Sequence, residues 1–226
     1  MSPKRVYIVL SALLALFLGA LDTLVMGAAM PTVVADLRGL HLYSWVFSVY
    51  LLSRAISLPI YGKMADLFST RKLFMLSIAI FIAGSVAAGI ATSMVQLIFG
   101  RILQGIGAGG NFALVYIVLS DIATPGKRGK MMSLASFVWG VASVLGPSMG
   151  GFIVNYFSWR WIFFINVPLG GLSFIGIYLF FNETRDKRKR IVNDYAGAVV
   201  LSTASFSLLT ALFVGRGRFA WYSWQV

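Results

Sequence analysis

The stretch Gly140-Val141-Ala142-Ser143-Val144-Leu145-Gly146-Pro147-Ser148-Met149-Gly150-Gly151 decides the fold, because it sets four glycines and a proline inside a long apolar segment. Glycine and proline weaken a helix in water. In a membrane, small residues let neighbouring helix backbones approach closely, and other helices satisfy the carbonyl that proline frees. The stretch is therefore typical of a membrane-spanning helix that packs tightly against its neighbours.

The composition also indicates a membrane protein, with 59% hydrophobic residues, 12% charged residues and a mean hydropathy of +0.85 over 226 residues. A spanning helix needs about 20 mostly apolar residues, whereas a membrane β-barrel uses shorter strands of alternating polarity. The apolar runs here are continuous, so we predict an all-α membrane protein. The first run is too long, and too directly followed by further spans, for a cleaved signal peptide. The seven predicted spans are Val6–Met30, Tyr43–Tyr61, Leu73–Thr92, Val95–Leu119, Met131–Tyr156, Trp161–Phe181 and Tyr195–Val214.

The formal net charge of +12 comes from basic residues in alternate loops, a pattern that indicates membrane topology rather than nucleic-acid binding. The positive-inside rule then predicts a cytoplasmic N-terminus. The run Arg185–Arg190 could also bind anionic lipid headgroups, although a plain topology signal is the simpler interpretation. The predicted inner segments hold Lys4, Arg5, Lys63, Arg71, Lys72, Lys127, Arg128, Lys130, Arg185, Lys187, Arg188, Lys189 and Arg190, and the outer segments hold Arg38, Arg160, Arg216 and Arg218.

The chain divides into two predicted parts. Residues 1–184 form a six-helix transmembrane bundle, and residues 185–226 form a basic cytoplasmic linker, a seventh helix and the start of an outer loop. The aromatic residues of Arg216–Val226 are typical of a membrane interface that leads to a further span. Because a lone seventh helix would lack a bundle to pack in, we expect this chain to be the N-terminal part of a longer transporter whose C-terminal half is missing here.

Five motifs, in order along the chain, resemble those of the major facilitator superfamily, and specifically its fourteen-helix branch of drug:proton antiporters. They are Leu21–Pro31, Gly62–Lys72, Arg101–Gly109, Gly140–Gly151 and Trp159–Pro168. The resemblance covers the first six predicted spans. It implies a six-helix N-terminal bundle plus a seventh helix, and proton-coupled efflux of hydrophobic or cationic small molecules without a cofactor.

Two of these motifs depart from the family pattern. The first-span motif has Leu24 and Gly27 where the branch usually has Thr or Ser and Asn, which weakens the case for a polar substrate contact there. The loop motif has Ser69 in place of its second glycine. The resemblance still implies a conformational latch at the cytoplasmic end, formed by Gly62, Asp66, Arg71 and Lys72.

Small residues of the fourth and fifth spans are predicted to pack helices and to prevent leak. Gly146 and Gly150 lie four residues apart on one helix face, the spacing of close helix contact. We expect this face to seal the fifth span against the opposite half of the transporter. The full set is Gly105, Gly109, Gly140, Gly146, Pro147, Gly150 and Gly151.

Three ionisable residues lie inside predicted spans, where charge is costly and by default marks a functional site. At 1.5 Å per residue, Asp22 lies about 12 Å, Arg101 about 9 Å and Arg54 about 16 Å below the outer end of its span. Their depths overlap, so we expect at least one arginine to approach Asp22, with Arg101 the better candidate because the fourth-span motif accompanies it. Asp22, Arg101 and Arg54 are the candidate proton-coupling residues; a static ion pair is the alternative.

Two patterns of soluble enzymes also occur but lack the required context. Gly146–Gly150 fits the G-x-S-x-G nucleophile motif, and Gly105–Gly110 fits G-x-G-x-x-G, yet both need a preceding strand. The only histidine, His41, is predicted to be interfacial, and with no cysteine there is no thiolate metal site. We therefore predict a transporter rather than an enzyme, located in a bacterial inner membrane. An importer or uniporter of another solute, and an intramembrane hydrolase, are the alternatives.

Overall fold

The computed structural model describes residues 3–124 and 126–182, together with residues 197, 200, 203, 204 and 207. The described chain is helical, which confirms the predicted all-α fold. The predicted seventh span and the basic run Arg185–Arg190 lie outside the continuous described segments, so that division of the chain stays a prediction. The helices are α1 (Pro3–Leu37), η1 (Leu40–Leu42, a 3₁₀ turn), α2 (Tyr43–Leu67), α3 (Thr70–Gly89), α4 (Met94–Ile122), α5 (Arg128–Tyr156), α6 (Trp161–Phe164) and α7 (Asn166–Phe180).

Five of the described helical segments are long and apolar enough to cross a membrane: α1, α3, α4, α5 and the stretch Trp161–Phe180. Helix α2 is more polar because it carries Arg54, Lys63 and Asp66, yet it packs along α4 within the same bundle. Helix α1 has 35 residues, about 52 Å at 1.5 Å per residue, which exceeds the roughly 30 Å of membrane hydrocarbon. The sixth span runs through α6 and α7, and Ile165 between them keeps helical backbone angles (φ −62°, ψ −24°).

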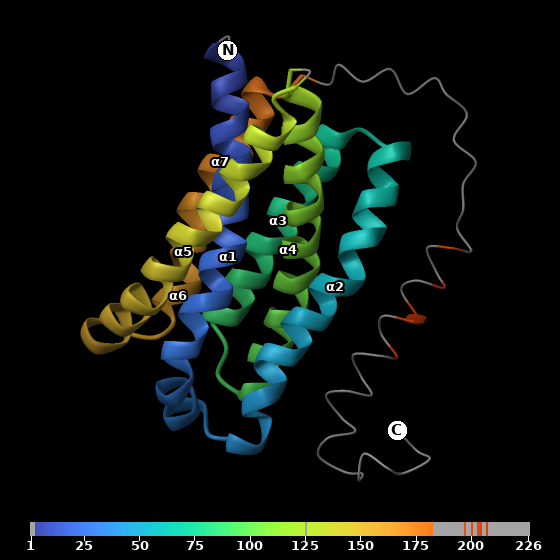
Figure 1. Ribbon diagram of the computed structural model, residues 1–226. Coiled ribbons are helices and arrows are strands. Elements are labelled where there is room, and N and C mark those ends of the chain that lie inside the picture. The colour runs from blue at the N-terminus through green and yellow to red at the C-terminus, as the bar shows by residue number, and fades with distance from the viewer. Residues whose placement is uncertain are drawn as a thin grey trace.

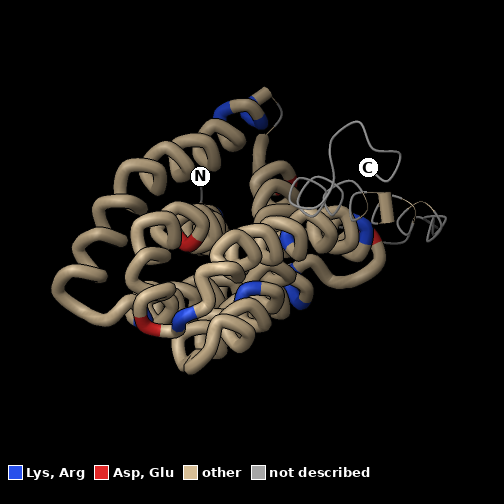
Figure 2. The backbone as a smooth tube through the Cα atoms, turned by 90° about the horizontal axis from the view of Figure 1, so that it is seen from below, with Lys and Arg blue, Asp and Glu red and all other residues tan. Residues whose placement is uncertain are grey.

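The helices form one bundle with α1 and α4 near its middle (Figure 1). Helix α5 packs mainly on α1, and α2 mainly on α4, so α5 and α2 lie on opposite sides of this pair. Helix α3 covers α4, and α7 packs against both α1 and α3. Charged residues are sparse along the described helices (Figure 2), as expected for elements that face lipid and one another.

The core consists of two main apolar clusters stacked along α1. One contains Ile8, Leu16 and Phe74 near the N-terminal end of α1, and the other contains Met30, Val33 and residues of the opposite end. The first half of α1 serves one cluster and the second half the other. Polar side chains between the two clusters are therefore shielded at both ends by packed apolar residues.

The glycines of α4 pack on two different helices. A methyl group at Gly105 would lie 2.6 Å from the Tyr50 carbonyl oxygen on α2, closer than van der Waals contact allows. Gly109 meets α2 in the same way. Gly107 and Gly110 instead contact Phe81 and Ser77 on α3, so the G-x-G-x-x-G pattern is a two-sided helix-packing surface.

The packing of α5 corrects the prediction that Gly146 and Gly150 face the opposite half of the transporter. A methyl group at Gly146 would lie 2.6 Å from Cβ of Leu24, and one at Gly150 would lie 2.9 Å from the Val25 carbonyl oxygen, both on α1. The two glycines therefore seat α5 on α1 within this bundle. Leu24, which replaces a polar residue of the family pattern, is the side chain that fills the space beside Gly146.

The remaining small residues predicted on α5 face open space. A methyl group at Gly140 or Gly151 would meet nothing within 4 Å in the described bundle, and Pro147 is exposed. Their packing role is therefore not fulfilled by the helices described here. Ser148 lies in the same helix and donates to the Val144 carbonyl at 3.0 Å, so the G-x-S-x-G pattern lacks the strand and turn of a nucleophile motif.

Candidate functional site

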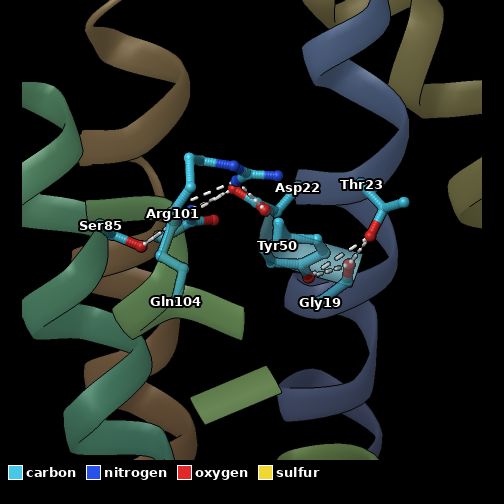
Figure 3. Close-up of polar contacts among 8 residues, drawn as sticks. Gly19, Asp22, Thr23, Tyr50, Ser85, Arg101 and Gln104 are labelled. Atoms are coloured by element: carbon cyan, nitrogen blue, oxygen red, sulfur yellow. Dashed lines mark hydrogen bonds and ion pairs between the residues drawn. The ribbon is translucent and has the colours of Figure 1, made fainter. Parts of the chain in front are cut away.

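A buried ion pair joins α1 to α4 in the interior of the bundle (Figure 3). Nη1 of Arg101 lies 2.5 Å from Oδ2 of Asp22, and the two residues are 1% and 2% exposed. Asp22 is the only buried acid among the described residues. Both charged groups are removed from water. This desolvation is costly unless the two groups lie close together and further hydrogen bonds satisfy their remaining donors and acceptors.

Amide and hydroxyl groups from three helices complete the pair. Nε2 of Gln104 donates to Asp22 Oδ1 at 3.1 Å and to Ser85 Oγ at 2.7 Å, and its Oε1 accepts from Arg101 at 2.9 Å. Nδ2 of Asn166 donates to Asp22 Oδ1 at 3.4 Å and to Ser85 Oγ at 3.2 Å. Asp22 thus accepts hydrogen bonds from α4 and from α7, and Ser85 links the same groups to α3.

Tyr50 of α2 holds Arg101 on its other side. The guanidinium carbon lies 4.0 Å from the centre of the Tyr50 ring, a close cation–π contact. The Tyr50 hydroxyl donates to the Gly19 carbonyl at 3.3 Å and accepts from Thr23 at 3.4 Å (Figure 3). The Arg101 Nε atom is buried and has no partner among the described residues. Side chains from five helices, α1, α2, α3, α4 and α7, therefore surround one carboxylate and one guanidinium.

The second predicted arginine takes a different position. Arg54 on α2 makes no ion pair with Asp22; its guanidinium carbon lies 4.8 Å from the ring centre of Phe112 on α4 and 5.3 Å from that of Trp139 on α5. The structure thus brings Arg101 to Asp22 and leaves Arg54 apart from that pair. The role of all three residues in proton coupling stays a prediction.

The predicted cytoplasmic latch residues lie around the turn between α2 and α3. The Arg71 guanidinium donates to the Tyr178 carbonyl on α7 and lies 5.2 Å from the centre of the Tyr178 ring. Ser69, which replaces a glycine of the family motif, accepts from the Lys72 amide at 3.4 Å and caps α3. A methyl group at Gly62 would meet nothing within 4 Å in the described bundle, so there is room beside Gly62 for movement or for another part of the protein.

The opposite end of the bundle has its own polar cluster. Oδ2 of Asp36 accepts from Trp159 Nε1 at 2.9 Å and from Arg160 at 2.8 Å, and Arg160 also donates to the Ala91 carbonyl at 3.1 Å. These contacts tie the end of α1 to the loops before α4 and α6. The Arg160 and Asp36 side chains are 31% and 47% exposed, so this pair is a surface contact.

An open apolar cavity of about 490 Å³ lies at the surface of the bundle between α5, α6 and α7, where Phe152, Phe157 and Trp161 are exposed. Its walls include Met149, Phe152, Phe157, Trp161, Phe164 and Pro168. A small neighbouring recess shares Met149, Ile153 and Ile165 with this cavity and reaches Asp22 and Asn166. The recess has no room for a water molecule, so packed side chains separate the cavity from the buried carboxylate.

Several residues of this site had no role in the sequence-based prediction. Gln104 and Asn166 fall within recognised motifs, and a polar amide in an apolar span was the signal that could have marked them. Ser85 and Tyr50 carried no comparable signal, because both residue types are common in membrane helices. Among the described residues, no group of three or more His, Cys, Asp or Glu side chains could hold a metal ion.

Comparison with known proteins assigns the family. The family model for the Major Facilitator Superfamily matches residues 12–225. The chain belongs to this superfamily. The assignment confirms the resemblance of the five motifs and places the Asp22–Arg101 pair inside the N-terminal bundle of a major facilitator protein.

Similar proteins include Multidrug resistance protein 3 and Multidrug transporter protein MdtP, both of Bacillus subtilis (strain 168). The first is 36% identical over 220 residues, which covers 97% of this chain and 43% of that protein. The second is 38% identical over 223 residues, which covers 99% of this chain and 41% of that protein. The chain thus spans about two-fifths of the length of these curated relatives.

A solved structure with the same fold is the partially occluded, inward-open xylose transporter XylE from E. coli. It matches with a TM-score of 0.72 and 19% sequence identity, over 95% of this chain and 60% of that one. At this identity the likeness establishes the fold alone. It agrees with an N-terminal major facilitator bundle.

Proposed function

We propose that this chain is the N-terminal part of a proton-coupled exporter of apolar small molecules. The names of the similar Bacillus subtilis proteins, which describe multidrug resistance and multidrug transport, support efflux. The family assignment favours transport over hydrolysis, as does the helical setting of Ser148. The apolar cavity between α5, α6 and α7 supports an apolar substrate.

The observation that carries proton coupling is the burial of Asp22 in a network of five helices. A carboxylate is neutralised by one proton, and the proton removes its attraction for Arg101 and weakens the charge-assisted hydrogen bonds that it accepts. Because those bonds come from α4 and α7, protonation changes how α1 is held to both helices. A change of charge at Asp22 can therefore bias the arrangement of the bundle, as alternating access requires.

The proposal includes an orientation and a latch. The N-terminus lies in the cytoplasm of a bacterial cell, and the turn that carries Gly62, Asp66, Arg71 and Lys72 faces the same side. These residues engage the C-terminal half of the transporter in one of its two states. The Asp22 network would then respond to protons, and the latch would respond to substrate. The two lie toward opposite ends of α2 and α3.

The test uses the full-length protein that contains this chain, purified in detergent and reconstituted in vesicles. Asp22→Asn should abolish proton release on substrate addition, and it should abolish export driven by a pH gradient, because the amide cannot give up a proton. Asp36→Asn is the matched control, since it removes the same charge from the exposed outer cluster. Export by the Asp22→Asn protein at the normal rate, with normal proton release, would refute the assignment.

A further inference from the structure

Arg54 presents an unneutralised guanidinium in the middle of a predicted span. It lies eleven residues after Tyr43, about 16 Å along the helix, and so deep within the roughly 30 Å hydrocarbon layer. A guanidinium has five N–H donors. In the described part of the chain, the Arg54 side chain donates to no acceptor and pairs with no carboxylate, whereas Arg101 has Asp22. A charge at this depth in a membrane is costly unless an opposite charge or a hydrogen-bond acceptor lies beside it.

Two aromatic rings fix the position of this charge without neutralising it. Phe112 of α4 and Trp139 of α5 both lie within cation–π distance of the guanidinium carbon, at 4.8 Å and 5.3 Å. The side chain thus extends from α2 past α4 to α5, and it is only partly buried. Its N–H groups remain available to a molecule that approaches between α2 and α5.

Arg54, Asn111 and Phe112 also line a small recess, together with small and aliphatic residues of α1 and α4. The recess has no room for a water molecule, and Asn111 is 1% exposed. A ligand of Arg54 therefore lies outside this recess, on the side where Trp139 contacts the guanidinium.

We propose that Arg54 forms a binding site for the carboxylate of an apolar substrate, with Phe112 and Trp139 against its aromatic or aliphatic body. A carboxylate offers two oxygens to the guanidinium in a bidentate, charge-assisted pair. This inference rests on the proposed transport function and narrows it. The transported compounds would include apolar acids, in contrast to the cationic compounds that the sequence resemblance implies.

The experiment measures equilibrium binding to the full-length detergent-purified protein and not transport, so it is independent of proton coupling. The probes are 2-naphthoate and its neutral analogue 2-naphthamide, which have nearly the same shape. We expect 2-naphthoate to bind at least about tenfold more tightly than the amide, the effect of one charge-assisted hydrogen bond. Arg54→Gln should remove this preference, and Arg54→Lys should keep part of it. Arg38→Gln, which removes the same charge at the outer end of the bundle, should leave it unchanged.

Equal binding of the two probes by the unmodified protein would overturn the proposal. It would also be overturned if Arg54→Gln lowered the melting temperature without changing the preference for 2-naphthoate. That result would assign the carboxylate partner to an acidic side chain elsewhere in the full-length protein. Failure of the Asp22 experiment with a retained preference for 2-naphthoate would refute proton coupling alone.

Discussion

The seam between α1 and α5 allows a quantitative prediction about Gly146. In Gly146→Ala the new methyl carbon would lie 2.6 Å from Cβ of Leu24, whereas two carbon atoms in contact prefer about 3.5–4.0 Å. The helices must therefore separate locally by about 1 Å. Overpacking of this kind costs about 1–3 kcal/mol, and the gain in helix propensity from glycine to alanine returns at most about 1 kcal/mol. We expect a net loss of up to about 2 kcal/mol.

The measurement is the melting temperature of the full-length protein in detergent, with Gly151→Ala as the matched control. Gly151 lies in the same helix, but its methyl position meets nothing within 4 Å, so alanine there should be neutral or slightly stabilising. At roughly 2–4 °C per kcal/mol, Gly146→Ala should melt several degrees below Gly151→Ala. Equal melting temperatures for the two variants would show that α5 does not rest on α1 in the way described.

Four further substitutions, one of them also combined with Asp22→Asn, test the rest of the bundle by the same melting measurement. Arg101→Ala should cost about 3–5 kcal/mol because it leaves the Asp22 carboxylate buried without its cation, and adding Asp22→Asn should restore part of the loss; no restoration would contradict the pairing. Asn166→Leu should cost about 1–3 kcal/mol through the lost donors to Asp22 and Ser85, and an unchanged melting temperature would count against that contact. At the end of the bundle that carries Asp36, Trp159→Ala should cost about 3–5 kcal/mol because the ring is 3% exposed, while Arg160→Ala should cost less than about 1 kcal/mol; the reverse order would refute this description of the Asp36 cluster.

The sequence predicted the fold class and the depth of the ionisable residues, because both follow from hydropathy and from the cost of charge in a membrane. The motif favoured Arg101 over Arg54 as the partner of Asp22, but periodicity along a single helix does not say which neighbour Arg54 meets. In the structure Arg101 contacts Asp22, and Arg54 is held between Phe112 and Trp139 instead. That difference depends on how α2, α4 and α5 are placed around α1, which is a property of the whole bundle.

The glycine pattern shows the same limit. The spacing of Gly146 and Gly150 correctly indicates one closely packed face, but spacing alone does not identify the partner helix. The partner is α1, where Leu24 fills the gap beside Gly146.

The hydrogen bonds to Asp22 restrict which helices of this bundle can be replaced by those of other major facilitator proteins. The carboxylate on α1 accepts from Arg101 and Gln104 on α4 and from Asn166 on α7. Consider a chimaera in which α4 alone is replaced by that of a distant relative. Its hydrogen-bond donors would be placed for a carboxylate at another position, so the Asp22 carboxylate would be left buried without a partner. Chimaeras of this half should therefore fold when α1, α4 and α7 all come from the same parent protein, and should not fold when they come from different parents.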